Sequence, residues 1–142
     1  MVTEAIRLLA VSELPLDVAA VSAAVEDPRA GGVAVFVGAV RNHDGGRSVA
    51  RLEYTAHPSV DATMRSVADE IVARYDVIAL AAVHRVGRLA VGDTAVVTAA
   101  ACAHRGEAFE ACRSLIDDLK RQLPIWKHQI FADGTEEWVG TP

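Results

Sequence analysis

Positively charged and histidine side chains gather at three places in this sequence. Each is a junction, where an apolar run gives way to a polar segment or where proline interrupts the chain. The members are Arg41, His43 and Arg47; then His104 and Arg105; then Lys120, Arg121, Lys127 and His128. Ligands commonly dock at such junctions because a rigid scaffold holds the groups there. If the three junctions meet in the folded protein, they predict an anion site, most simply for a phosphate; if not, these are ordinary surface cations.

The second junction has a further reason to bind an anion. The segment that follows it, from residue 106 to about 122, has the apolar periodicity of a helix. A helix N-terminus offers free N–H groups and the positive end of the helix dipole. His104 and Arg105 come directly before that N-terminus and would add to its attraction for a phosphate.

Lys120 and Lys127 could do more than bind. A lysine that is partly desolvated and surrounded by other cations can lose its proton near neutral pH, and then act as a general base, a general acid or a nucleophile. Lys127 lies between Trp126 and His128 on a predicted strand, so its side chain should face opposite to both. The alternative for Lys120 is a purely structural role, as a cation at the C-terminal end of a helix.

Other side chains give weaker signals. Cys102 and Cys112 lie ten residues apart with no CxxC or paired-histidine spacing, so we expect no metal site. The glycine pairs match neither a P-loop nor a dinucleotide-binding motif, and no cofactor is expected. Cys112 falls on the apolar face of the predicted helix and should be core, whereas Cys102 ends a strand near His104 and could be a reactive thiol. His57 and His84 have no evident partner and are expected to be structural or surface residues.

The composition excludes several classes of protein. The chain has 142 residues, of which 51% are hydrophobic and 5% aromatic, and its net charge is −5. This is the size of one domain that folds without disulfides, and we expect residues 1–142 to form it. The acidic balance argues against nucleic acid as a partner. No apolar run is long enough for a membrane span, and no signal peptide is evident, so a cytoplasmic protein is expected.

The elements that must position these residues alternate irregularly between strand and helix. The predicted strands are 6–11, 33–40, 49–56, 77–86, 94–102, 125–131 and 137–139, and the predicted helices are 15–25, 58–75 and 106–122. Most neighbouring strands follow one another with no helix between them, which favours an α+β fold with largely antiparallel pairing. The continuous apolar run 33–40 predicts a strand buried on both faces, and it could pair with 49–56 as a hairpin with a long loop.

Three segments together resemble one protein family. They are Phe36-Val-Gly-Ala-Val-Arg41-Asn-His, Ala103-His104-Arg105 and Leu119-Lys120-Arg-Gln-Leu-Pro124-Ile-Trp126-Lys127. Phe131-Ala-Asp-Gly134 and Trp138-Val139 fit as well, so the resemblance runs from about Val33 to Val139. In this order and spacing, the segments are similar to the catalytic (large) subunit of molybdopterin synthase.

The resemblance implies a fold and a reaction. The fold would be an α/β hammerhead-like single domain with a mostly antiparallel sheet and a small added antiparallel subdomain. The family adds two sulfurs to cyclic pyranopterin monophosphate, which forms the dithiolene of molybdopterin. The sulfur arrives as a thiocarboxylate on the C-terminal Gly-Gly of a small ubiquitin-like sulfur-carrier subunit. The large subunits form a homodimer at the core of a heterotetramer.

The resemblance also assigns roles to residues. Lys120 and Lys127 match the two family lysines: Lys120 would perform acid–base chemistry or form a transient covalent attachment, and Lys127 would activate or hold the substrate. Arg41, His104 and Arg105 match the anion-binding positions. Phe36 would line the pocket.

This sequence departs from the family pattern at two positions. Family members often have a carboxylate two residues after the second lysine, where this chain has Gln129. A methionine that is common near the first lysine is replaced here by Ile116, an apolar exchange that a core tolerates. The alternative function is a non-catalytic α+β dimer that binds a phosphorylated ligand. It keeps the cation cluster but needs no lysine chemistry.

Overall fold

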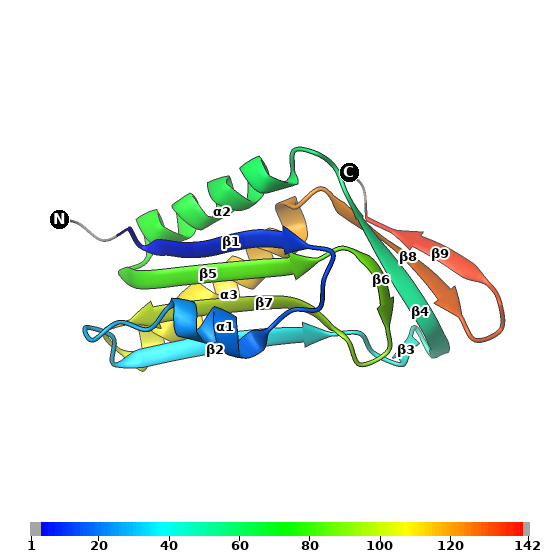
Figure 1. Cartoon of the computed structure of the whole chain (residues 1–142), viewed down its shortest axis with the longest axis horizontal. Coiled ribbons are helices and arrows are strands. Elements are labelled where there is room, and N and C mark those ends of the chain that lie inside the picture. Colours follow the sequence, from blue (N-terminus) through cyan, green and yellow to red (C-terminus); the bar gives the residue numbers. More distant parts are fainter. Residues whose placement is uncertain (1–3, 141–142) are drawn as a thin grey trace.

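The computed structural model describes residues 4–140, which form two sheets and three helices (Figure 1). The first sheet has the strand order β1 (Ile6–Ser12), β5 (Val77–Arg85), β7 (Thr94–Cys102), β2 (Gly32–Ala39). The second contains β3 (His43–Asp44), β4 (Arg47–Ala56), β8 (Ile125–Phe131) and β9 (Glu136–Val139), with β6 (Gly87–Ala90) also paired to β4. The helices are α1 (Val18–Ala24), α2 (Val60–Arg74) and α3 (Arg105–Gln122). The α+β fold with mostly antiparallel pairing is confirmed, and β1 with β5 is the parallel exception.

Small side chains hold the layers of the first sheet close together. Helices α2 and α3 lie side by side on one face of the sheet, and α1 lies on the other face (Figure 1). Alanines of β5 and β7 are buried between these layers; they include Ala79, Ala81, Ala82, Ala99, Ala100 and Ala101. On the face covered by α2 and α3 the bulk comes from the helices, where Met64, Ile71, Leu115 and Leu119 fill the space above Ala82 and Ala100. A core of this kind loses stability when a methylene is removed or added, because protein interiors are close-packed.

The sequence-based prediction for strand β2 was wrong in two respects. Its partner is β7, with Val35 opposite Ala99, and it does not form a hairpin with β4. Nor is it buried on both faces: Val33, Val35 and Val37 are 49%, 38% and 42% exposed. Helix α3 covers one face of β2, but α1 packs on β1, β5 and β7 and does not extend to the edge strand. An apolar edge strand therefore looks like a central strand in the sequence.

The second sheet forms the small antiparallel subdomain that the resemblance implied. Strand β4 is long enough to pair with β3 at one end and with β8 and β6 along the rest of its length. A small apolar cluster of Val40, Leu52, Leu89 and Ala95 joins this sheet to the first one. Strand β6 was not predicted, because it follows β5 after a single residue and the chain turns there through Gly87 with φ +90°. None of the helices described is long and apolar enough to cross a membrane.

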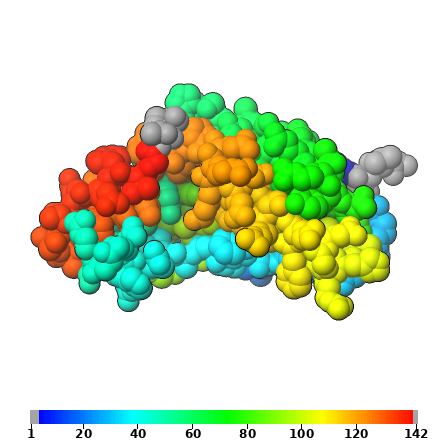
Figure 2. Space-filling view, turned by 180° about the vertical axis from the view of Figure 1, so that it is seen from behind, coloured from blue at the N-terminus to red at the C-terminus, as the bar shows by residue number. Residues whose placement is uncertain are grey.

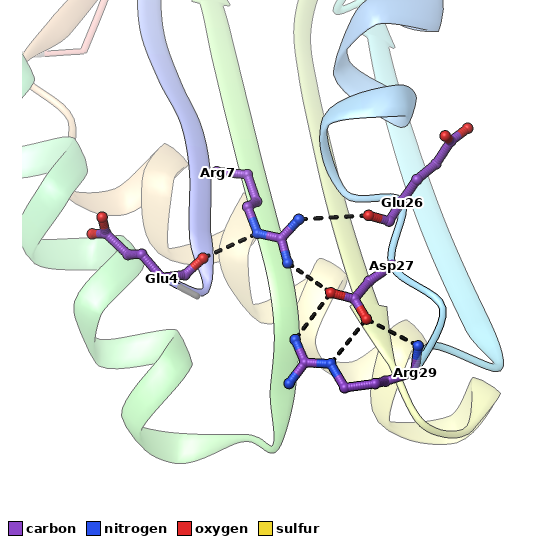
Figure 3. A network of polar contacts seen from close by, with 5 residues as sticks. All are labelled: Glu4, Arg7, Glu26, Asp27 and Arg29. Atoms are coloured by element: carbon purple, nitrogen blue, oxygen red, sulfur yellow. Dashed lines mark hydrogen bonds and ion pairs between the residues drawn. The ribbon is translucent and has the colours of Figure 1, made fainter. Parts of the chain in front are cut away.

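A carboxylate ties the first strand to the turn before β2 (Figure 3). Asp27 accepts a hydrogen bond of 2.8 Å from Arg7 on β1, and its other oxygen accepts from the Arg29 side chain and backbone N–H, both at 2.9 Å. The Arg7 guanidinium also donates to the backbone oxygen of Glu4 at 3.0 Å. The hydrogen bonds from the Arg29 side chain and backbone, with a smaller effect of Arg7, hold the pKa of Asp27 well below its usual range.

We predict that Asp27 contributes a measurable part of the acid sensitivity of folding. Its folded pKa is below the unfolded value, so its contribution is present above about pH 4 and is lost as the pH falls further. Between pH 5 and pH 3 the melting temperature of the wild type should therefore fall more steeply than that of Asp27→Asn. The matched control is Glu13→Gln, an exposed carboxylate beyond the end of β1. Parallel curves for the wild type and Asp27→Asn would contradict this account.

Candidate functional site

Lys120 and Lys127 are the only lysines among the fourteen Lys and Arg residues of this chain, and both line the same cavity. Helix α3 carries Lys120 in its last turn, and the helix ends two residues later. Pro124 prevents the helix from continuing, so the chain turns and enters β8 at Ile125. Strand β8 then runs antiparallel along β4, with Lys127 opposite Tyr54. The reversal at Pro124 brings the two amines, seven residues apart, to one hollow.

The cavity opens into a second hollow that contains two more of the predicted site residues. Phe36, in the middle of β2, and Arg41, directly after the apolar run, line this hollow together with both lysines. Figure 2 shows this face of the molecule, hollowed between the cyan end of β2, the orange end of α3 and the red β9. A side chain at Gly38 would place its Cβ 2.7 Å from a Val96 methyl and 3.3 Å from the Phe36 ring. Glycine at 38 therefore lets that ring lie beside the cavity.

His104 and Arg105 are not in this cavity. They lie at the N-terminal end of α3, beside Gly31 and Phe109. Arg105 begins the helix and Lys120 follows it by fifteen residues, which at 1.5 Å per residue is about 22 Å along the axis. A Cβ at Gly32 would lie 2.8 Å from the backbone of Arg105, so glycine is needed for β2 to start against this turn. One chain therefore brings Phe36, Arg41, Lys120 and Lys127 together and leaves the other two predicted residues apart.

Two uncharged polar side chains, which the sequence did not point to, also line the lysine cavity. They are His84 from the end of β5 and Tyr54 from β4, with ring centroids 5.0 Å apart in an edge-to-face contact. The Nδ1 of His84 lies 2.7 Å from the carbonyl oxygen of Arg85, which can only accept, so this nitrogen is assigned the proton. Burial, and less strongly the Lys120 charge, lower the pKa of His84, so the ring stays neutral and its Nε2 is an acceptor.

The two cysteine thiols are buried and free. Cys112 lies against Thr98, with its Sγ 3.4 Å from the threonine hydroxyl. Cys102 belongs to the core under α2 and α3. Burial raises the pKa of both thiols, which argues against the reactive thiol that the sequence allowed at Cys102. Within residues 4–140, no group of three or more His, Cys, Asp or Glu side chains is placed to hold a metal ion.

Comparisons with known proteins identify relatives for nearly the whole chain. The family model described as "MoaE protein" matches residues 11–122. The molybdopterin synthase catalytic subunit 1 of Mycobacterium tuberculosis is 43% identical over 130 residues, which cover 91% of this chain and 88% of the relative. The corresponding subunit of a Nostoc species is 39% identical and covers 92% of this chain and 80% of its own length.

Solved structures agree with this relationship. The crystal structure of molybdopterin synthase from Staphylococcus aureus superposes with a TM-score of 0.86 at 30% identity, covering 92% of this chain and 95% of the other. The molybdopterin biosynthesis MoaE protein from Burkholderia ambifaria superposes with a TM-score of 0.79 at 36% identity, covering 93% and 88%.

We predict that neither thiol of the folded protein reacts rapidly with a disulfide reagent at pH 7. Burial hinders the reagent and keeps the sulfur protonated, whereas the thiolate is the reactive form. Both should react at once in guanidinium chloride. Cys112→Ala leaves Cys102 as the only thiol and isolates its rate. Rapid reaction of Cys102 in folded Cys112→Ala would restore it as a candidate nucleophile.

Proposed function

Because this chain belongs to the MoaE protein family, we propose that its lysine cavity is the active site of a molybdopterin synthase. The chain is the catalytic subunit of that enzyme, a sulfurtransferase. Its substrate is cyclic pyranopterin monophosphate, which receives two sulfurs to form the dithiolene. The sulfur donor is the C-terminal thiocarboxylate of a small ubiquitin-like subunit ending in Gly-Gly. The observation that carries the assignment is that both lysines of the chain line one cavity.

The chemistry of the lining fits these reactants. Arg41 with the two lysines offers positive charge to a phosphate and to a thiocarboxylate, and Phe36 offers an apolar wall to a ring. Lys120 serves in acid–base chemistry or in transient covalent attachment, and Lys127 activates or holds the substrate. The enzyme needs no nucleophilic cysteine because the sulfur is delivered by the partner. Two buried thiols are compatible with that.

The remaining two predicted residues, His104 and Arg105, reach the cavity if a second copy of the chain supplies them. The outer edge of β2 has no neighbouring strand within the described residues, and its three valines are exposed. Antiparallel pairing of two such edges about a twofold axis would put the start of one β2 beside the end of the other. The turn with His104 and Arg105 lies at the start of β2, and Arg41 follows its end.

We therefore propose a homodimer with two composite active sites, at the core of a heterotetramer with one small subunit at each outer end. We further propose that residues 1–142 form one domain and that the enzyme acts in the cytoplasm. The apolar cluster shared by the two sheets supports the single domain. The free thiols are in keeping with a reducing compartment.

Lys120→Ala should abolish molybdopterin formation. With thiocarboxylated small subunit and cyclic precursor supplied, we expect product formation to fall by at least about 100-fold, because a group acting on the reacting atoms is lost. The dimer and its binding of the small subunit should persist. The control is Arg121→Ala, which removes a neighbouring cation and leaves Asp118 paired with Arg74 at 3.2 Å. Near-wild-type turnover in Lys120→Ala would refute the assigned role, and no dithiolene from the wild type would favour a binding-only protein.

A composite site predicts complementation between two inactive variants. In a heterodimer of Lys120→Ala with Arg105→Ala, one site carries both changes and the other carries neither. We therefore expect the doubly tagged, purified heterodimer to show about half the wild-type rate per dimer. Each homodimeric variant should be close to inactive. A heterodimer as inactive as its parents would show that each site draws both residues from one chain.

A further inference from the structure

A carboxylate lines the same hollow as the second lysine, but it comes from β3 and not from β8. Gln129 occupies the position where the resemblance led us to expect an acid, and its Nε2 donates a 2.7 Å hydrogen bond to Oδ2 of Asp44. The other oxygen, Oδ1, is 3.6 Å from the Arg41 guanidinium. Asp44 lines the same hollow as Arg41, Lys120 and Lys127. It is thus the acidic side chain among the cations of that hollow.

The side-chain amide of Gln129 holds this carboxylate from a buried position. It is 2% exposed, and a buried side-chain amide needs partners for its polar atoms. Lys127 and Gln129 are two residues apart on β8, so their side chains share one face of the strand. Strand β3 is only two residues long and pairs with the start of β4, and it places Asp44 in direct contact with Gln129 in the wall of the hollow.

The hydrogen bond between residues 44 and 129 requires that one of them is an acid and the other an amide. The hydrogen bond from Gln129 is the main cause that lowers the pKa of Asp44, and the charges of Lys127 and Arg41 add to it. Asp44 is therefore ionised at neutral pH and offsets part of the repulsion among the three cations. A second carboxylate at 129 would face the first within hydrogen-bonding distance, and like charges so close cannot both ionise freely.

We propose that Asp44, held by Gln129, is the residue that positions Lys127 and Arg41 in the active site. This inference rests on the proposed function of the cavity. Asp44 acts through the two cations and not on the substrate: it keeps the Lys127 ammonium and the Arg41 guanidinium directed into the hollow. Without it, three like charges would spread apart, and the substrate would meet a disordered set of cations.

Enzyme kinetics separate this role from a merely structural one. Asp44→Asn keeps the shape and can still accept from Gln129, but it has no charge. We expect kcat to fall by about 10-fold or more, because the cations are misplaced. The KM for the anionic substrate should not rise, because the hollow becomes more positive. An Asp44 that only braces the β3–β4 turn predicts the reverse, an unchanged kcat with a lower melting temperature.

Exchange of the two residues provides the rescue. Gln129→Glu alone should be impaired, since it places two carboxylates together. The double variant Asp44→Asn/Gln129→Glu restores one acid and one amide in the same hollow, and we expect its kcat to return to within about threefold of the wild type. Its control is Asp133→Asn/Gln129→Glu, which removes an acid from the β8–β9 turn instead. Failure of the double variant to exceed both single variants would overturn the proposal.

A second readout does not depend on activity. Lys120 and Lys127 are the only side-chain amines of the protein, so an amine-reactive ester labels them with little competition, and peptide masses report each rate separately. In Asp44→Asn the labelling rate of Lys127 should rise severalfold relative to that of Lys120. In the double variant this ratio should return to the wild-type value. Unchanged Lys127 labelling would refute the positioning role, whether or not the wild type makes product. Absence of product from the wild type would refute the proposed function instead.

Discussion

The length and direction of α3 determine which charged residues of one chain can lie together. The helix lies along β2 and β7, held by a buried face that includes Ala108, Leu115 and Leu119. It therefore fixes His104 and Arg105 at one end of the sheet and Lys120 at the other. The reversal at Pro124 brings Lys127 back to the same end as Lys120. The two lysines meet within one chain, whereas the turn with His104 and Arg105 would join them only if a second chain supplied it.

The rest of the architecture also favours a site that is shared between two chains. Alanines in β5 and β7 allow the helices to lie close to the sheet, and on the other face the short helix α1 covers β1, β5 and β7 but not the edge strand β2. The edge strand β2 is left with exposed valines and unpaired backbone groups, which in a monomer would invite aggregation. A second copy paired along this edge would cover the backbone groups and complete the site at the same time. Stability of the assembly and assembly of the active site would then depend on the same strand.

Much of the fold could be predicted because its elements are strongly periodic. Strands β7 and β8 and the helices α2 and α3 lie within two residues of their predicted bounds, and the cations gather at element ends, as expected. The pairing of β2 could not be predicted, because an apolar run does not tell an edge strand from a central one. His84 was expected to be a structural or surface residue, because the sequence shows no partner for it, yet it lines the lysine cavity. The Asp44–Gln129 contact joins residues 85 positions apart, and only strand register brings them together. For the lysine cavity, the sequence does contain a signal in its choice of basic residue. Twelve of the fourteen Lys and Arg residues are arginine. The structure places both lysines in one cavity.

The most direct test of the central claim is molybdopterin formation by a monomeric variant. Val35→Lys introduces a charge in the exposed middle of β2, opposite Ala99 and away from the lysine cavity. Its mass can be followed by sedimentation and its fold by circular dichroism. The account predicts a folded monomer that retains Lys120, Lys127, Asp44 and Gln129 yet makes no dithiolene product. A folded monomer with wild-type turnover would contradict it, since one chain would then hold a complete active site.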